Sequence, residues 1–116
     1  MRKIELYLTD IVEAADAIER FVDRARLDEF LNDEKGQSAV LQKMIVIGEA
    51  VARLPDDFRN RHPEIEWSKI VGLRNIIVHG YFSVNNSIIY ATAMTDVPEL
   101  RRKIALILKQ EFGKQF

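Results

Sequence analysis

The sequence predicts an all-α fold, a four- to five-helix bundle, and three observations support this. Apolar residues recur every three or four positions over long stretches, which places them on one side of a helix. No stretch alternates apolar and polar residues for long, and no Asn-Gly or Asp-Gly pair marks a hairpin. The chain has 116 residues, 47% hydrophobic and 30% charged, which is typical of one folded domain spanning residues 1–116.

The first helix is expected from Ile4 to about Ala25. Its apolar residues form one stripe, with Glu, Asp and Arg on the opposite face. The stripe consists of Ile4, Tyr7, Leu8, Ile11, Ala14, Ala15, Ile18, Phe21, Val22 and Ala25. A second helix is expected from about Glu34 to Leu54, where Pro55 stops it. Its apolar arc is wide, which predicts a position in the middle of the bundle.

Residues 54–67, LPDDFRNRHPEIEW, read as a polar connection that holds one short helical turn. His62 lies in this connection and is interpreted as a solvated loop residue. A third helix is expected from about Trp67 to His79, and Gly80 follows it where a left-handed cap is favoured. The expected core residues of this helix are Ile70, Leu73, Ile77 and Val78.

The last part of the chain predicts a short segment and a final amphipathic helix. The segment starts at Asn85 and ends near Thr95. Asp96 and Glu99, with Pro98 between them in the first turn, resemble a capping box that opens the helix. The apolar face of that helix consists of Leu100, Ile104, Ile107, Leu108 and Phe112.

Charge and composition exclude several classes of protein. The net charge of −1 does not favour nucleic acid over the whole surface, although a local basic patch is allowed. Its candidate members are Arg59, Arg61, Arg74, Arg101, Arg102 and Lys103. The absence of cysteine excludes disulfides and thiolate chemistry and favours a cytoplasmic setting. No apolar run reaches the length of a membrane span, so we expect no membrane contact.

The stretch RNIIVHGYF, residues 74–82, places polar residues at the C-terminal end of an otherwise apolar helix. Arg74 and His79 are separated by about 7.5 Å of helical rise and roughly 140° of rotation, so they start on different faces. An extended arginine could reach the imidazole, or a second copy of the site across a dimer axis could close the gap. We therefore expect a homodimer with its two copies of this stretch near the axis.

The chemistry of these residues suits attack of an RNA 2′-hydroxyl on the neighbouring phosphate. Histidine moves a proton near neutral pH. Arginine stabilises the charge that develops on phosphate oxygens. We therefore expect a reaction that needs no metal and no cofactor. By spacing alone, Arg74, His79 and Tyr81 could equally form a structural capping cluster.

Glu49 lies in the sequence IGEA, residues 47–50, within the most apolar helix. It either occupies a narrow polar seam that faces solvent, or faces Arg74 and orients it, because a buried carboxylate needs a partner. Gly48 beside it permits close approach of another helix. No phosphate-cradling glycine loop, GxSxG elbow, HExxH pair or EF-hand loop supports another chemistry.

These residues resemble the HepT-like branch of the HEPN superfamily. Its signature is Arg, four residues, His, one residue and Tyr, which Arg74, His79 and Tyr81 fill, with Asn75 matching the Asn that often follows the Arg. The segments DIVEAADAIERF, IGEAVARLPDDFRNRHPEIEWSKIVGLRN and DVPELRRKI resemble this branch in the same order. The resemblance implies a HEPN-like bundle. The spacer between Arg74 and His79 lacks the basic residue that related sequences often carry. RNA binding is therefore expected either to be weaker or to come from elsewhere, such as Arg101, Arg102 and Lys103.

The resemblance implies a homodimeric toxin of a type VII toxin–antitoxin pair. Such toxins are metal-independent ribonucleases, with Arg74 and His79 carried over as catalytic residues. Asn75, which matches the motif, and Glu49, interpreted above from the residues alone, are expected to support them. The implied partner is a MntA-like nucleotidyltransferase antitoxin that silences the toxin by transferring AMP from ATP onto Tyr81. The expected substrate is tRNA or mRNA, and no DNA partner is expected. The alternative is a non-catalytic helical partner that docks a nucleotidyltransferase.

Overall fold

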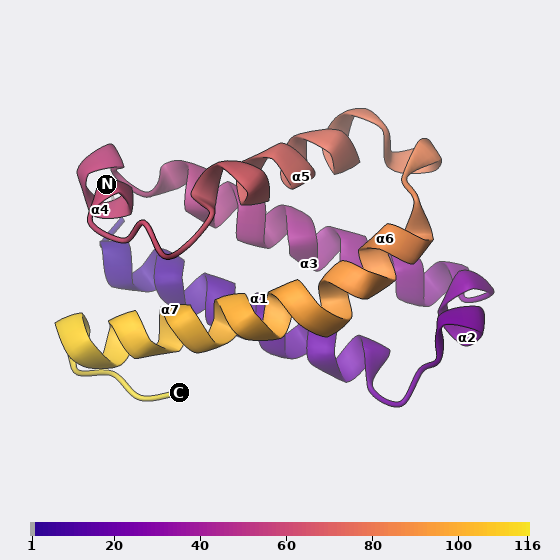
Figure 1. Ribbon diagram of the computed structural model, residues 1–116, viewed down its shortest axis with the longest axis horizontal. Helices are drawn as coiled ribbons and strands as arrows, with labels where there is room; N and C mark the ends of the chain where they lie inside the picture. Colours follow the sequence, from indigo (N-terminus) through magenta and orange to yellow (C-terminus); the bar gives the residue numbers. More distant parts are fainter. Residues whose placement is uncertain (1) are drawn as a thin grey trace.

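The computed structural model describes residues 2–116, and within them every regular element is helical (Figure 1). This confirms the predicted all-α class. The longer helices are α1 (Ile4–Val22), α3 (Glu34–Arg53), α5 (Trp67–His79) and α7 (Val97–Phe112). The shorter elements are α2 (Leu27–Leu31), α4 (Asp56–Asn60), the 3₁₀ turn η1 (Tyr81–Ser83), α6 (Asn86–Ala91) and the π-helical turn η2 (Thr92–Asp96). No helix in this part of the chain is long and apolar enough to cross a membrane.

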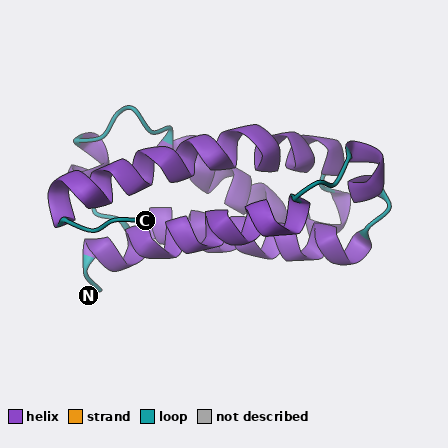
Figure 2. Ribbon diagram, turned by 90° about the horizontal axis from the view of Figure 1, so that it is seen from below, coloured by secondary structure: helices purple, strands orange, loops and turns teal. Residues whose placement is uncertain are grey.

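The long helices pack in the order α5, α3, α1, α7. Helix α1 contacts α3 on one side and α7 on the other, while α3 also packs against α5. This arrangement confirms the middle position expected for α3. Helix α5 has α3 as its main partner and therefore forms one edge of the bundle (Figure 1). Figure 2 shows both termini at the same end of the elongated molecule.

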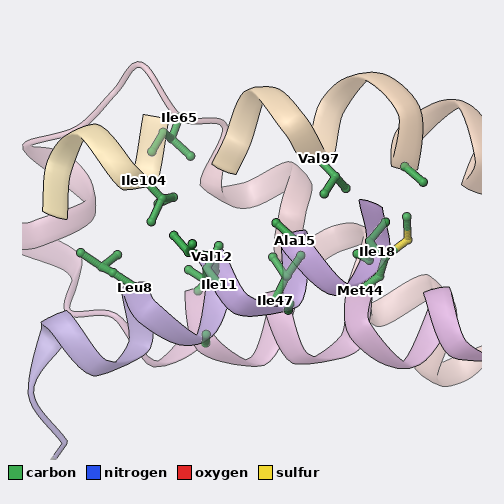
Figure 3. Packing of buried hydrophobic residues seen from close by; sticks show 14 of the residues in the cluster. Leu8, Ile11, Val12, Ala15, Ile18, Met44, Ile47, Ile65, Val97 and Ile104 are labelled. Carbon is green, nitrogen blue, oxygen red and sulfur yellow. The ribbon is translucent and has the colours of Figure 1, made fainter. Parts of the chain in front are cut away.

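The core is built on α1. Nine of its 19 residues are buried, and most of them belong to the predicted stripe. Figure 3 shows Leu8, Val12 and Ile18 in the layer that α1 shares with Ile47 of α3 and Ile104 of α7. Burying each such aliphatic side chain contributes about 1.5–3 kcal/mol. The stripe therefore anchors α1 between two neighbours.

Helix α1 ends earlier than predicted, at Val22 rather than near Ala25. The chain turns there through Arg24, whose φ of 62° is left-handed. The turn leads into α2, which the sequence did not predict, and lets Phe30 pack against Tyr90 with ring centroids 5.6 Å apart. The Tyr90 hydroxyl donates a hydrogen bond to the Ala25 carbonyl at 2.6 Å. These contacts join residues far apart in the sequence, so local periodicity could not indicate them.

The predicted capping box at Asp96 is wrong. Asp96 has helical angles, φ −71° and ψ −39°, and its side chain caps nothing. Because Pro98 has no N–H to donate, the backbone widens into the π turn, and the Val97 N–H bonds to the Thr92 carbonyl. Helices α6 and α7 are therefore joined through η2 without a break, and Glu99 binds Arg102 instead of a helix N-terminus, at 2.6 Å.

His62 is not the solvated loop residue that the sequence predicted. Its side chain is 13% exposed, and its ring packs against Phe58 in a tilted arrangement with centroids 4.8 Å apart. The two ring nitrogens lie 3.2 Å from Glu64 and 2.6 Å from Glu111, the latter near the end of α7. His62 therefore links the connection after α4 to the C-terminal end of α7. Helix α4 is the short helical turn that the sequence predicted.

Candidate functional site

Arg74 lies on the face of α5 that packs against α3. The predicted close approach of the two helices at Gly48 is confirmed, because a Cβ on Gly48 would lie 2.3 Å from the Cβ of Arg74. The Nη1 atom of Arg74 lies 2.5 Å from Oε1 of Glu49 on α3. Glu49 therefore faces Arg74, as one of its two interpretations predicted.

The pair between Arg74 and Glu49 is only partly shielded from water. The arginine side chain is 19% exposed and the glutamate side chain 43%. A half-exposed ion pair of this kind contributes at most about 1 kcal/mol to stability. The Nε atom of Arg74 is buried and has no hydrogen-bond partner among residues 2–116. The contact therefore does more to fix the direction of the guanidinium than to stabilise the fold.

His79 ends α5 and lies exposed to solvent beside the exposed Asn75. Within the described residues, no hydrogen bond or ion pair joins His79 to Arg74, whose one bonded partner is Glu49. This agrees with the helix geometry, which places the two side chains on different faces. A single chain thus presents an anchored guanidinium and a free imidazole that do not contact each other.

The predicted left-handed cap at Gly80 is wrong. Gly80 has a φ of −137°, and its N–H still bonds to the Ile76 carbonyl at 2.9 Å. The Gly80 carbonyl then accepts from the Ser83 N–H at 2.9 Å, which forms the 3₁₀ turn η1. The helix tightens instead of reversing, so no left-handed residue is needed.

Tyr81 begins this 3₁₀ turn, two residues beyond His79. Its ring is partly buried and contacts Phe82 edge to face, with centroids 5.6 Å apart. Its hydroxyl makes no hydrogen bond to any residue in the described part of the chain. By contrast, Tyr7 is only 7% exposed and the Tyr90 hydroxyl is bonded to the Ala25 carbonyl. Of the three tyrosines, Tyr81 is therefore the one that is neither fully buried nor hydrogen-bonded through its hydroxyl within the described residues.

Large apolar side chains surround the exit of α5. Ile76 is 63% exposed, Val78 50% and Phe82 101%. Val78 was predicted to be core, and that prediction is wrong. Helix α5 packs mainly against α3, and within the run of residues 76–78 only Ile77 faces inward and is fully buried. We call Ile76, Val78 and Phe82 the α5 exit surface. In the sequence, the apolar run of residues 76–78 indicated this surface, because three consecutive apolar residues in a helix cannot all face the core.

The candidate basic residues do not form an uncompensated patch. Each has a nearby partner: Arg74 binds Glu49, Arg59 binds Asp56, Arg61 binds Glu111, Arg101 binds Asp16, Arg102 binds Glu99, and Lys103 binds the Glu64 carbonyl. The hydrogen bond from Arg102 also lowers the pKa of Glu99. Among residues 2–116, no three His, Asp or Glu side chains are grouped so that they could hold a metal ion.

Comparison with known proteins matches the family described as Ribonuclease HepT-like over residues 11–107. The probable ribonuclease HepT of Thermococcus cleftensis is 38% identical over 103 residues, which cover 89% of this chain and 94% of that protein. A Methanocaldococcus jannaschii protein, to which an RNase activity is ascribed by name, is 37% identical over 113 residues, 97% of this chain and 93% of its own. No solved structure gives a significant match.

Proposed function

The chain belongs to the HepT-like ribonuclease family, and from this membership we propose that it is a metal-independent ribonuclease toxin that cuts RNA with Arg74 and His79. The observation that carries the proposal is the arrangement at the exit of α5. There the anchored arginine and the free, exposed histidine follow each other on one helix. The names of the relatives support the same reaction class.

In the proposed reaction, the 2′-oxygen of a ribose attacks the adjacent phosphorus. A neutral His79 imidazole accepts the 2′-hydroxyl proton, the new P–O bond forms, and the bond to the 5′-oxygen breaks. The leaving oxygen takes a proton from an imidazolium, which a second copy of His79 could supply. Arg74 stabilises the negative charge that develops on the phosphate oxygens. These groups supply both proton transfer and charge stabilisation, so the proposed step needs no metal.

We also propose that the active form is a homodimer, formed through the α5 exit surface. Helix α5 is an edge helix, and three large apolar side chains at its exit are left in contact with water. An apolar patch beside a polar motif favours contact with another protein surface. Pairing of two such surfaces would bring two copies of His79 close to the two copies of Arg74.

We propose that a MntA-like nucleotidyltransferase antitoxin silences the protein by AMP transfer to Tyr81. In this step the tyrosine oxygen attacks the α-phosphate of ATP, and pyrophosphate leaves. The unbonded hydroxyl of Tyr81 and its place beside His79 support this choice over Tyr7 and Tyr90. The attached phosphodiester would place negative charge and bulk where the RNA phosphate binds. Mass spectrometry after incubation with ATP and the antitoxin should locate the AMP on Tyr81, and full labelling of Tyr81→Phe would contradict this.

The decisive experiment is RNA cleavage in EDTA by the wild type, Arg74→Ala and His79→Ala, with total tRNA and an mRNA as substrates. Loss of His79 should lower the rate by about 10²- to 10⁴-fold, since it removes proton transfer. Because His79 is exposed and unbonded, the melting temperature should stay unchanged.

His62→Ala is the matched control, because the chain has two histidines and His62 has a structural environment. It should keep the cleavage rate per folded molecule but melt at a lower temperature. Cleavage that requires a divalent metal, or an unchanged rate in His79→Ala, would contradict the proposed mechanism. A wild type that binds the nucleotidyltransferase but cuts neither RNA would favour the docking subunit instead.

A further inference from the structure

Gly48 lies on α3 where this helix meets α5, and it is buried. A Cβ atom on Gly48 would lie 2.3 Å from the Cβ of Arg74 and 2.6 Å from its Cγ. Carbon atoms in contact are about 3.5 Å apart or more. The aliphatic stem of Arg74, its Cβ and Cγ atoms, therefore occupies the space that any side chain at position 48 would need.

The contact with Cβ has a consequence that the contact with Cγ lacks. A change of rotamer can move the Cγ of Arg74, but its Cβ is fixed by the backbone of α5. A side chain at position 48 can be accommodated only if α5 moves away from α3 by about 1 Å, the difference between overlap and contact. Such a shift would move Arg74 and, with it, His79 at the end of the same helix.

The next residue of α3 holds the other end of the same side chain. Glu49 binds Nη1 of Arg74 at 2.5 Å, while the stem lies against Gly48. We propose that Gly48 is a positioning residue, which sets the distance between α3 and α5 and so places the Arg74 guanidinium for the reaction. This inference rests on the proposed function for its catalytic part. Its structural part stands on the geometry alone.

The structural part is tested by melting temperatures in three backgrounds. Alanine has the higher helix propensity, so Gly48→Ala would stabilise α3 if no clash occurred. We expect it instead to lower the melting temperature by about 5–15 °C in the wild type, as overpacking does. In the Arg74→Ala background the Cβ remains, and the loss should persist. In the Arg74→Gly background both carbons are gone, and Gly48→Ala should cause no loss.

Equal losses in all three backgrounds would show that the clash does not involve Arg74 and would overturn the proposal. An unchanged or higher melting temperature of Gly48→Ala in the wild-type background would overturn it as well. If Gly48→Ala alone does not fold, the double variant with Arg74→Gly must restore folding, and its failure to do so would count against the proposal.

The positioning role is tested by kinetics and by nuclear magnetic resonance. Gly72→Ala on α5 is the matched control, because a Cβ there would meet nothing within 4 Å. Gly48→Ala should lower kcat by about 10²-fold, as expected for a displacement of about 1 Å, while KM changes far less. The nitrogen-15 resonance of Arg74 Nε, identified by its loss in Arg74→Lys, should shift in Gly48→Ala and stay in place in Gly72→Ala.

An unshifted resonance together with an unchanged kcat in folded Gly48→Ala would overturn the positioning role. A wild type that cuts no RNA would contradict the proposed function instead. The melting temperatures and the Arg74 resonance would then still decide whether Gly48 places the arginine. The two failures are therefore distinguishable.

Discussion

Helices α1 and α5 are both rich in apolar residues, but the structure uses them differently. Nine of the 19 residues of α1 are buried, whereas only Trp67 and Ile77 are buried among the 13 residues of α5. Helix α1 lies between α3 and α7, and α5 has α3 as its main partner. The number of packed neighbours, rather than the apolar content, decides how much of each helix is covered.

This difference shows how to interpret apolar residues with and without a polar face opposite them. In α1 they follow the helical period, and the fold buries them. At the exit of α5, residues 76–78 point in all directions, and the single chain buries only Ile77. An apolar run of this kind beside His79 indicates a surface that another molecule covers. Substitutions in the buried stripe of α1 should therefore affect folding, and substitutions in the α5 exit surface should affect association.

The largest expected effect separates the two helices by stability. Ile18→Ala in α1 removes a side chain that is 0% exposed and should cost about 2–5 kcal/mol in the free energy of unfolding. Ile76→Ala in α5 removes one that is 63% exposed and should cost the isolated chain about 0.5 kcal/mol or less. Urea unfolding at low protein concentration checks both. Similar costs for the two variants would contradict the difference in burial between α1 and α5.

The next effect concerns association. Phe82→Ser removes the most exposed apolar ring of the α5 exit surface and should raise the Kd of the homodimer at least tenfold, about 1.4 kcal/mol or more. Phe21, which is 40% exposed on α1, provides the matched control, and Phe21→Ser should leave association unchanged. Sedimentation at several micromolar concentrations measures both. A monomeric wild type, or equal effects of the two variants, would argue against this interface.

A smaller effect of opposite sign is expected within α5. Gly72→Ala should stabilise the chain by about 0.5–1 kcal/mol, because alanine favours the helix and a Cβ would meet nothing within 4 Å. Denaturant unfolding measures the gain. A loss of stability would mean that α5 has a neighbour on this face. That result would change the description of α5 as an edge helix.

The smallest effect depends on pH. Near the start of α5, a hydrogen bond from Lys69 lowers the pKa of Glu66, and the same contact raises the pKa of Lys69. A glutamate with a lowered pKa in the folded state contributes stability above its ordinary pKa of 4.5 and loses it as the pH falls through the folded value. Lys69→Ala should therefore lower the melting temperature more at pH 7 than at pH 3.

Ile18→Ala is the control for this pH dependence, because its cost arises from apolar contacts and should be similar at both values. The ion pair between Lys69 and Glu66 is exposed, so its effect is expected to be small. A loss in Lys69→Ala that is equal at pH 3 and pH 7 would show that the ion pair does not stabilise the start of α5.

Much of the fold could be predicted because local signals agree with the tertiary structure. Helix α3 begins after Asp33, which accepts a hydrogen bond from the Gly36 N–H at 2.9 Å, and ends just before Pro55. Helix α5 has the predicted bounds, Trp67–His79. For α3 the signals that begin and end the helix lie within one turn of its ends, so they can be identified without knowledge of distant residues.

Two of the predictions that proved wrong depended on residues far away in the sequence. The early end of α1 allows Phe30 to meet Tyr90, and His62 is covered because Glu111 lies beside it. At Asp96, a capping signal was present, but the chain continues as a helix because the π turn accommodates Pro98. The local sequence determines which backbone conformations have low free energy, and the packing of distant elements selects among them.

The sequence by itself determined the helical class, the bounds of α3 and α5, and the position of Arg74, His79 and Tyr81 at the exit of one helix. Only the tertiary structure decided that Glu49 faces Arg74, that Gly48 leaves room for the arginine stem, and that Val78 stays exposed. The physical reason is the range of the forces involved. Hydrogen bonding and side-chain periodicity act within a few residues of a helix, whereas burial depends on which other helix lies against each face.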